Sequence, residues 1–173
     1  MNLASMIIRR LGISIATMFL VSACVSQELK TTIPFEPSEV SYINESGSGS
    51  IIGKTFRRRQ GGGGAVSCRS QQVFLIPAGT FVRQRIAQLF GSESGGIRSS
   101  WSFAKDEGLS RYLSLSKRTK PDAAGNFEFP NLADGDYYVV ACERWTIGYS
   151  VDGVCGARLV RLRGGGIENV LID

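Results

Sequence analysis

Short stretches in which apolar and polar residues alternate make up most of the chain after residue 50. Alternation with a period of two is typical of β-strands that bury one face, and the glycines, prolines and aspartates between the stretches indicate turns. About seven short strands of this kind predict an all-β fold, an antiparallel β-sandwich. The strands are predicted at residues 50–58, 71–79, 125–132, 135–145, 158–162 and 167–172, with one more inside 110–120.

One stretch departs from this alternation. Apolar residues recur at helical spacing between Phe81 and Phe90, and Gly91 is a typical residue at which a helix ends. We therefore predict a short helix over residues 83–90, inserted in a connection between strands. The glycine- and serine-rich residues 92–110 that follow are predicted to form a loop.

The first residues carry a different pattern. Arg9 and Arg10 precede an apolar run that is too short to cross a bilayer as a helix, for which about 20 residues are needed. A basic start, a short apolar run and small residues at its end are typical of a secretory signal peptide, predicted here at residues 1–23. The letters VSAC, which end at Cys24, resemble the bacterial lipobox, and this resemblance implies cleavage before Cys24 and attachment of lipid to its thiol. The alternative is ordinary cleavage after Ala23, which would leave a free thiol.

The residues after Cys24 predict where the protein is held. Val25 stands where an aspartate would resemble an inner-membrane retention signal, so we expect a lipid anchor in the outer membrane, on its periplasmic face. Prolines and polar residues without a sustained period predict a lipidated tether over residues 24–49. The remaining residues, 50–173, are enough for one compact domain.

The net charge of the chain does little to identify its partner. The formal net charge is +5, and loss of Arg9 and Arg10 with the signal peptide would leave +3. A mildly basic surface is attracted to phosphates or carboxylates of the cell envelope, although such a charge also serves solubility alone. Nucleic acid is not an expected partner for a protein outside the inner membrane.

The cysteines beyond Cys24 allow one disulfide. Cys142 and Cys155 stand at the two ends of a segment that reads as two strands around a loop, which would bring their thiols together. The periplasm permits disulfides, so we predict this pair. Cys68 is then either buried and inert, or the true partner of one of the two.

The most specific stretch is DAAGNFEFPNLADGDYYVVA, residues 122–141. Asp122 and Gly125 predict a turn, and Phe127 and Phe129 lie on the same side of the strand that follows. The stretch resembles the carboxypeptidase regulatory-like domain, a transthyretin-like (prealbumin-like) β-sandwich, and the resemblance extends over roughly residues 50–172. It implies an accessory module that lends stability, spacing or a binding surface, with no shared catalytic residues.

The composition narrows the possible chemistry. The chain has no histidine, which excludes Ser-His-Asp and Cys-His catalysis and every histidine-containing zinc site. We expect no metal and no cofactor. An alternative function is a small envelope hydrolase that uses paired carboxylates, for which Asp134, Asp136 and Asp152 are the candidates, although turn formation also explains these residues.

Arg57, Arg58 and Arg59 form the candidate binding patch, because they lie at the end of the predicted first strand, next to a glycine-rich loop, and could bind phosphate or carboxylate groups. The alternative reading is a charged edge strand that discourages aggregation. Together with the loop at 92–110, the patch is our predicted contact surface. The sequence thus predicts a non-enzymatic binding or structural accessory module, held to the membrane by its lipid, with an envelope protein or peptidoglycan as partner.

Overall fold

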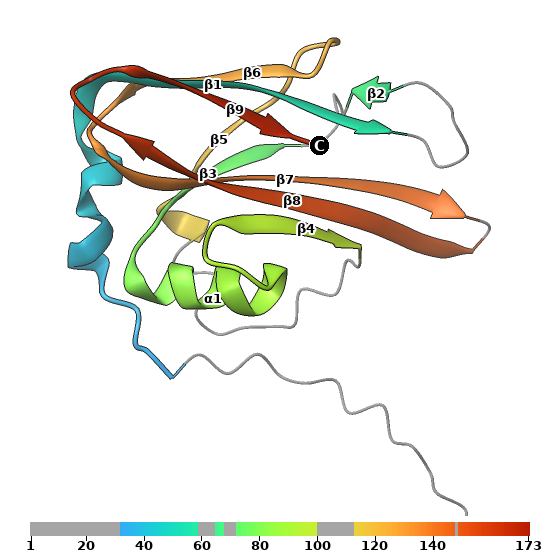
Figure 1. Ribbon diagram of the computed structural model, residues 1–173, viewed down its shortest axis with the longest axis horizontal. Coiled ribbons are helices and arrows are strands. Elements are labelled where there is room, and N and C mark those ends of the chain that lie inside the picture. Colours follow the sequence, from blue (N-terminus) through green and yellow to red (C-terminus); the bar gives the residue numbers. More distant parts are fainter. Residues whose placement is uncertain (1–31, 59–64, 68–71, 100–112, 148) are drawn as a thin grey trace, which may run out of the picture.

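The computed structural model describes residues 32–58, 65–67, 72–99, 113–147 and 149–173. Within these ranges, two β-sheets face each other and one helix covers the outer face of the larger sheet (Figure 1). The described elements are η1 (Pro37–Asn44), β1 (Ser46–Arg58), β2 (Ala65–Ser67), β3 (Val73–Pro77), α1 (Thr80–Phe90), β4 (Gly95–Ser99), β5 (Lys117–Thr119), β6 (Asn126–Leu132), β7 (Gly135–Ile147), β8 (Ser150–Leu162) and β9 (Ile167–Ile172).

The smaller sheet is built around β1. Strand β6 pairs with β1 in antiparallel orientation, β9 pairs with it in parallel orientation, and β2 pairs with its far end. The larger sheet has the order β4-β8-β7-β3-β5, and every pair in it is antiparallel. The parallel pair of β1 and β9 was not part of the predicted antiparallel pattern.

Residues on both faces of strand β7 are buried in the hydrophobic core. Tyr137 and Val139 are buried between the two sheets, where they join residues of β1, β6 and β9. Tyr138 and Val140 point the other way and are buried under α1. A strand that is covered on both faces reads as a continuous apolar run, which explains the letters YYVVA at this position.

The predicted β-sandwich is therefore confirmed, with corrections to individual elements. Helix α1 begins at Thr80, three residues before the predicted start, and ends at Phe90 as predicted. Gly91, which follows it, has a φ of 78°, the left-handed conformation typical of a helix terminus. The predicted loop at 92–110 contains strand β4 in its described part, and residues 100–110 lie outside the described residues.

The predicted tether at 24–49 is too long. Residues 37–49 belong to the domain, since Val40 and Ile43 of η1 are buried and β1 begins at Ser46. The physical reason is that these two apolar side chains, three residues apart, cover one end of the sandwich instead of remaining in water. The part of the predicted tether before residue 32 lies outside the described residues. In the described part of the chain, no helix is long and apolar enough to cross a membrane.

Candidate functional site

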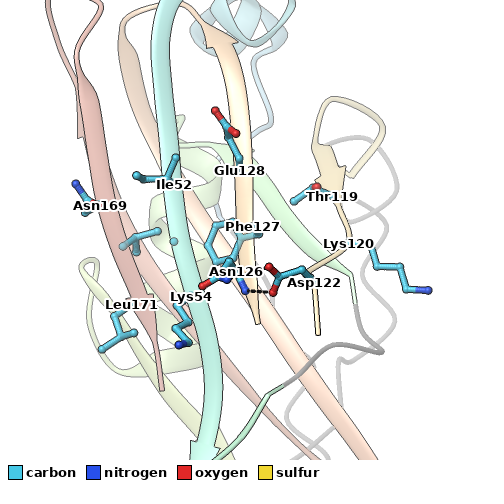
Figure 2. A pocket seen from close by; sticks show the side chains of 12 residues that line it. Ile52, Lys54, Thr119, Lys120, Asp122, Asn126, Phe127, Glu128, Asn169 and Leu171 are labelled. Atoms are coloured by element: carbon cyan, nitrogen blue, oxygen red, sulfur yellow. Dashed lines mark hydrogen bonds between the residues drawn. The ribbon is translucent and has the colours of Figure 1, made fainter. Parts of the chain in front are cut away.

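An open groove of about 860 Å³ runs along strands β9, β1 and β6 and reaches Thr119, at the end of β5, and Lys120 and Asp122 beyond it (Figure 2). Its position follows from the alternation of β1. Ile51 and Thr55 are buried between the sheets, so Ile52 and Lys54 stand on the outer face of the smaller sheet.

Strand register completes the outer face. Ile52 lies between Glu128 of β6 and Asn169 of β9, and the next outward row has Lys54 at its centre. Partners in register share a face, so an aliphatic side chain, an amide and a carboxylate meet in the first row. The second row joins Lys54 to Asn126 and Leu171. Figure 2 shows these residues along neighbouring strands.

Gly53 lets the three strands of the groove come together. A Cβ atom at this position would lie 2.4 Å from Cζ of Phe127 and 2.5 Å from the backbone oxygen of Val170. No real Cβ contact is that short, so a side chain here would push β6 or β9 away from β1. The buried ring of Phe127 thus lies directly beneath the floor of the groove.

A hydrogen-bonded turn lines one end of the groove. The Asp122 carboxylate accepts hydrogen bonds from the backbone N–H groups of Ala124 and Asn126, at 2.8 Å each, and from the Asn126 side-chain amide at 2.9 Å. These hydrogen bonds, that of the Asn126 side chain foremost, hold the pKa of Asp122 below its usual value. Gly125 has a φ of 85°, and its carbonyl accepts a hydrogen bond from the Thr55 backbone N–H, which ties the turn to β1. The turn predicted from Asp122 and Gly125 is confirmed.

The paired carboxylates considered for a hydrolase have other partners. Asp134 accepts hydrogen bonds from the backbone N–H groups of Gly164 and Gly165, which lower its pKa. Asp136 lies 2.5 Å from Arg83 and 2.5 Å from Arg163. Burial raises the pKa of Asp136, but the hydrogen bonds from Arg163 and Arg83 outweigh burial and the net shift is downward. A general acid needs a raised pKa, so this pair does not supply one.

Asp152, the third carboxylate considered, pairs through its backbone with Trp145 in the β7–β8 ladder. Among the residues that the structure describes, no three cysteine, aspartate or glutamate side chains are grouped so that they could hold a metal ion.

The structure joins Cys142 and Cys155 in a disulfide, as predicted. The two residues are direct cross-strand partners in β7 and β8, which is why their sulfur atoms meet. Cys155 is buried and Cys142 is half-buried. Cys24 and Cys68 lie outside the described residues.

Only part of the predicted arginine patch lies within the described residues. The backbones of Arg57 and Arg58 pair with Val66 and Ala65 of β2, whereas Arg59 falls outside. Their binding role stays a prediction, and the groove is lined by other residues. The sequence signal that was missed is the outward position of Lys54, Asn126 and Asn169 on three separate strands.

Comparison with known proteins supports the fold. No family model matches the chain, and no curated protein matches it. Among solved structures, it is similar to the crystal structure of a "putative carbohydrate binding protein" from Pseudomonas aeruginosa, with a TM-score of 0.60 and 19% sequence identity. The match covers 81% of this chain and 97% of that one. At this identity the likeness establishes a shared β-sandwich fold.

Proposed function

We propose that this protein is a non-enzymatic binding module, lipid-anchored through Cys24 at the periplasmic face of a bacterial outer membrane, and that its groove binds the glycan strands of peptidoglycan. The resemblance of VSAC to the lipobox supports the anchor. The sequence around residues 122–141 supports an accessory domain of the carboxypeptidase regulatory-like kind.

The observation that carries the choice of ligand is the pair of outward rows on β6, β1 and β9. Asn169 and Lys54 are exposed and offer amide and ammonium groups to hydroxyl and acetamido groups. Ile52 and Leu171 stand among them, and Leu171 is 47% exposed, so aliphatic contact with the C–H faces of a sugar ring is available. An apolar surface with a few placed polar groups is the usual make-up of a ligand site.

The shape of the groove also favours a polymer. It is open along its length and follows several strands, so a chain longer than the groove can lie across it. Asp122, at one end of the groove, is held by hydrogen bonds from Ala124 and Asn126 of its own turn. The similar structure from Pseudomonas aeruginosa is described as that of a carbohydrate binding protein, which is in line with a glycan as ligand.

Co-sedimentation with peptidoglycan sacculi tests the proposal. The full-length protein in detergent micelles should sediment with sacculi, and the double variant Lys54→Ala/Asn169→Ala should bind about tenfold more weakly, since two hydrogen-bonding groups are lost. Gln88→Ala, at an exposed position on α1, is the matched control and should bind as the parent does.

Sacculi stripped of their stem peptides by an amidase identify the part of the polymer that is bound. Retained binding is expected for a glycan ligand. Binding that disappears with the peptides would contradict the proposed glycan ligand. Binding that survives the double variant unchanged would contradict the proposed site. Capture of an envelope protein through the same groove, with no binding to sacculi, would contradict the proposed ligand.

A further inference from the structure

Residues 32–44 fix the side of the domain from which the chain leaves toward Cys24. The Thr32 hydroxyl accepts a hydrogen bond from the Gln84 side-chain amide of α1 at 3.2 Å, and the ring of Phe35 packs edge-on against Phe81 of α1, with centroids 5.7 Å apart. Val40 is buried. The chain therefore enters the described domain along α1.

The groove lies on the opposite side of the molecule. Helix α1 packs against the outer face of the larger sheet, whereas Ile52, Lys54 and Asn169 stand on the outer face of the smaller sheet. Figure 1 shows this order of layers, with α1 on one side and β9, β1 and β6 on the other. Stacked sheets lie about 10 Å apart, and a helix layer adds a similar distance, so about 20 Å separates the axis of α1 from the smaller sheet.

The stretch between Cys24 and Thr32 is short on this scale. Its eight residue steps can span at most about 29 Å when fully extended. An eight-residue chain with random-coil statistics would span only about 16 Å. To lay the groove face on the bilayer, this stretch would have to cover at least about 20 Å around the side of the domain, which is more than its random-coil span. If the α1 side rests on the bilayer instead, the stretch does not need to be extended.

We propose that the domain is held with its α1 side toward the bilayer and its groove facing away from it, so that the groove takes a glycan polymer lying beyond the domain rather than headgroups of its own membrane. This inference rests on the lipid anchor and the ligand of the proposed function, and it adds the direction in which the groove faces. The short stretch sets the orientation, because Thr32, Phe35 and Glu39 hold the chain to α1 before it leaves the domain.

Quenching of a fluorophore by quencher-labelled lipid headgroups tests the orientation. Full-length lipidated protein is reconstituted into phosphatidylethanolamine and phosphatidylglycerol vesicles, with Cys68→Ser in the background so that only the introduced thiol is labelled. A label at Gln88→Cys, on α1, should be quenched several-fold more strongly than a label at Ile167→Cys, on the outer face of β9. Equal quenching, or stronger quenching at residue 167, would overturn the proposal.

A longer tether in each of the two labelled variants tests whether tether length causes the orientation. Inserting about 20 glycine and serine residues after Ser26 would let the tether exceed the thickness of the domain, so the two labels should become quenched to similar degrees. A difference that persists unchanged would overturn tether length as the cause. Failure of the anchor itself has a separate readout, because an unlipidated chain would not float with the vesicles. If the protein does not bind peptidoglycan, co-sedimentation with sacculi shows this independently of the orientation.

Discussion

Glu39 caps helix α1 from outside the helix. Its carboxylate accepts a hydrogen bond from the Thr80 backbone N–H at 2.6 Å and another from the Thr80 hydroxyl at 3.0 Å. The first turn of a helix has N–H groups without helical partners and favours a nearby negative charge. A residue of η1 thereby replaces the side-chain cap that Gly79, directly before the helix, does not provide.

Glu39→Ala should lower the free energy of unfolding by about 1 kcal/mol, the usual cost of a lost N-terminal cap. Urea denaturation followed by circular dichroism measures this change. Glu36→Ala is the control, because Glu36 is an exposed residue of the same segment. An equal effect of the two substitutions would show that the contact between Glu39 and Thr80 contributes nothing.

Gly53→Ala should destabilise the domain by about 1–3 kcal/mol, because the added methyl group would overlap Phe127 and the backbone of Val170. The neighbouring substitution Lys54→Ala, at an outward position, should change the free energy of unfolding by less than about 0.5 kcal/mol. Thermal denaturation of both variants checks the pair of expectations. A domain that accepts Gly53→Ala at no cost would mean that β6 and β9 do not approach β1 as closely as described.

Local pattern predicted the strands but not their partners. The aromatic alternation around Phe127 and the apolar run at Tyr137 are signals contained within a few residues, and the strands expected there are present as β6 and β7. The parallel pairing of Ser50 with Ile167 joins residues more than a hundred positions apart. Nothing local in the sequence specifies such a pair, because backbone hydrogen bonds are the same for any strand.

The candidate groove was missed for the same reason. Lys54, Asn126 and Asn169 are ordinary polar positions on three separate strands, and only the register of β1 with β6 and β9 places them on one face. The domain boundary was missed for a different reason, because Val40 and Ile43 did carry a signal. Two apolar residues three positions apart, following Pro37, are enough for one turn of a buried helix.

Replacing Cys142 and Cys155 together by alanine should lower the free energy of unfolding by about 2–4 kcal/mol, since the bridge closes a loop across 13 positions. The comparison is made by urea denaturation of the oxidised parent and the double variant. Peptide mapping without reductant should recover the two cysteines as one cross-linked species. Recovery of Cys68 linked to either cysteine would contradict the pairing.

Asp136→Asn should destabilise the domain by about 1–3 kcal/mol at neutral pH, because the charge-assisted hydrogen bonds from Arg83 and Arg163 are weakened. Burial raises the pKa of Asp136, but hydrogen bonds from these arginines lower it overall, so the pKa is lower in the folded protein than in the unfolded chain. The stabilisation is therefore fully present above the unfolded pKa, about 3.9, and is lost as the pH falls through the folded value.

Urea denaturation of the parent and of Asp136→Asn across the acid range measures this dependence. The two unfolding free energies should differ at neutral pH and converge as the pH falls below about 4. Arg161→Gln is the control, because Arg161 lies 4.0 Å from Asp136 with its side chain 67% exposed, and an exposed pair contributes at most about 1 kcal/mol. A difference between parent and Asp136→Asn that stays constant down to acid pH would contradict a lowered pKa at this residue. It would mean that the arginines hold residue 136 by shape and hydrogen bonding alone, without its charge.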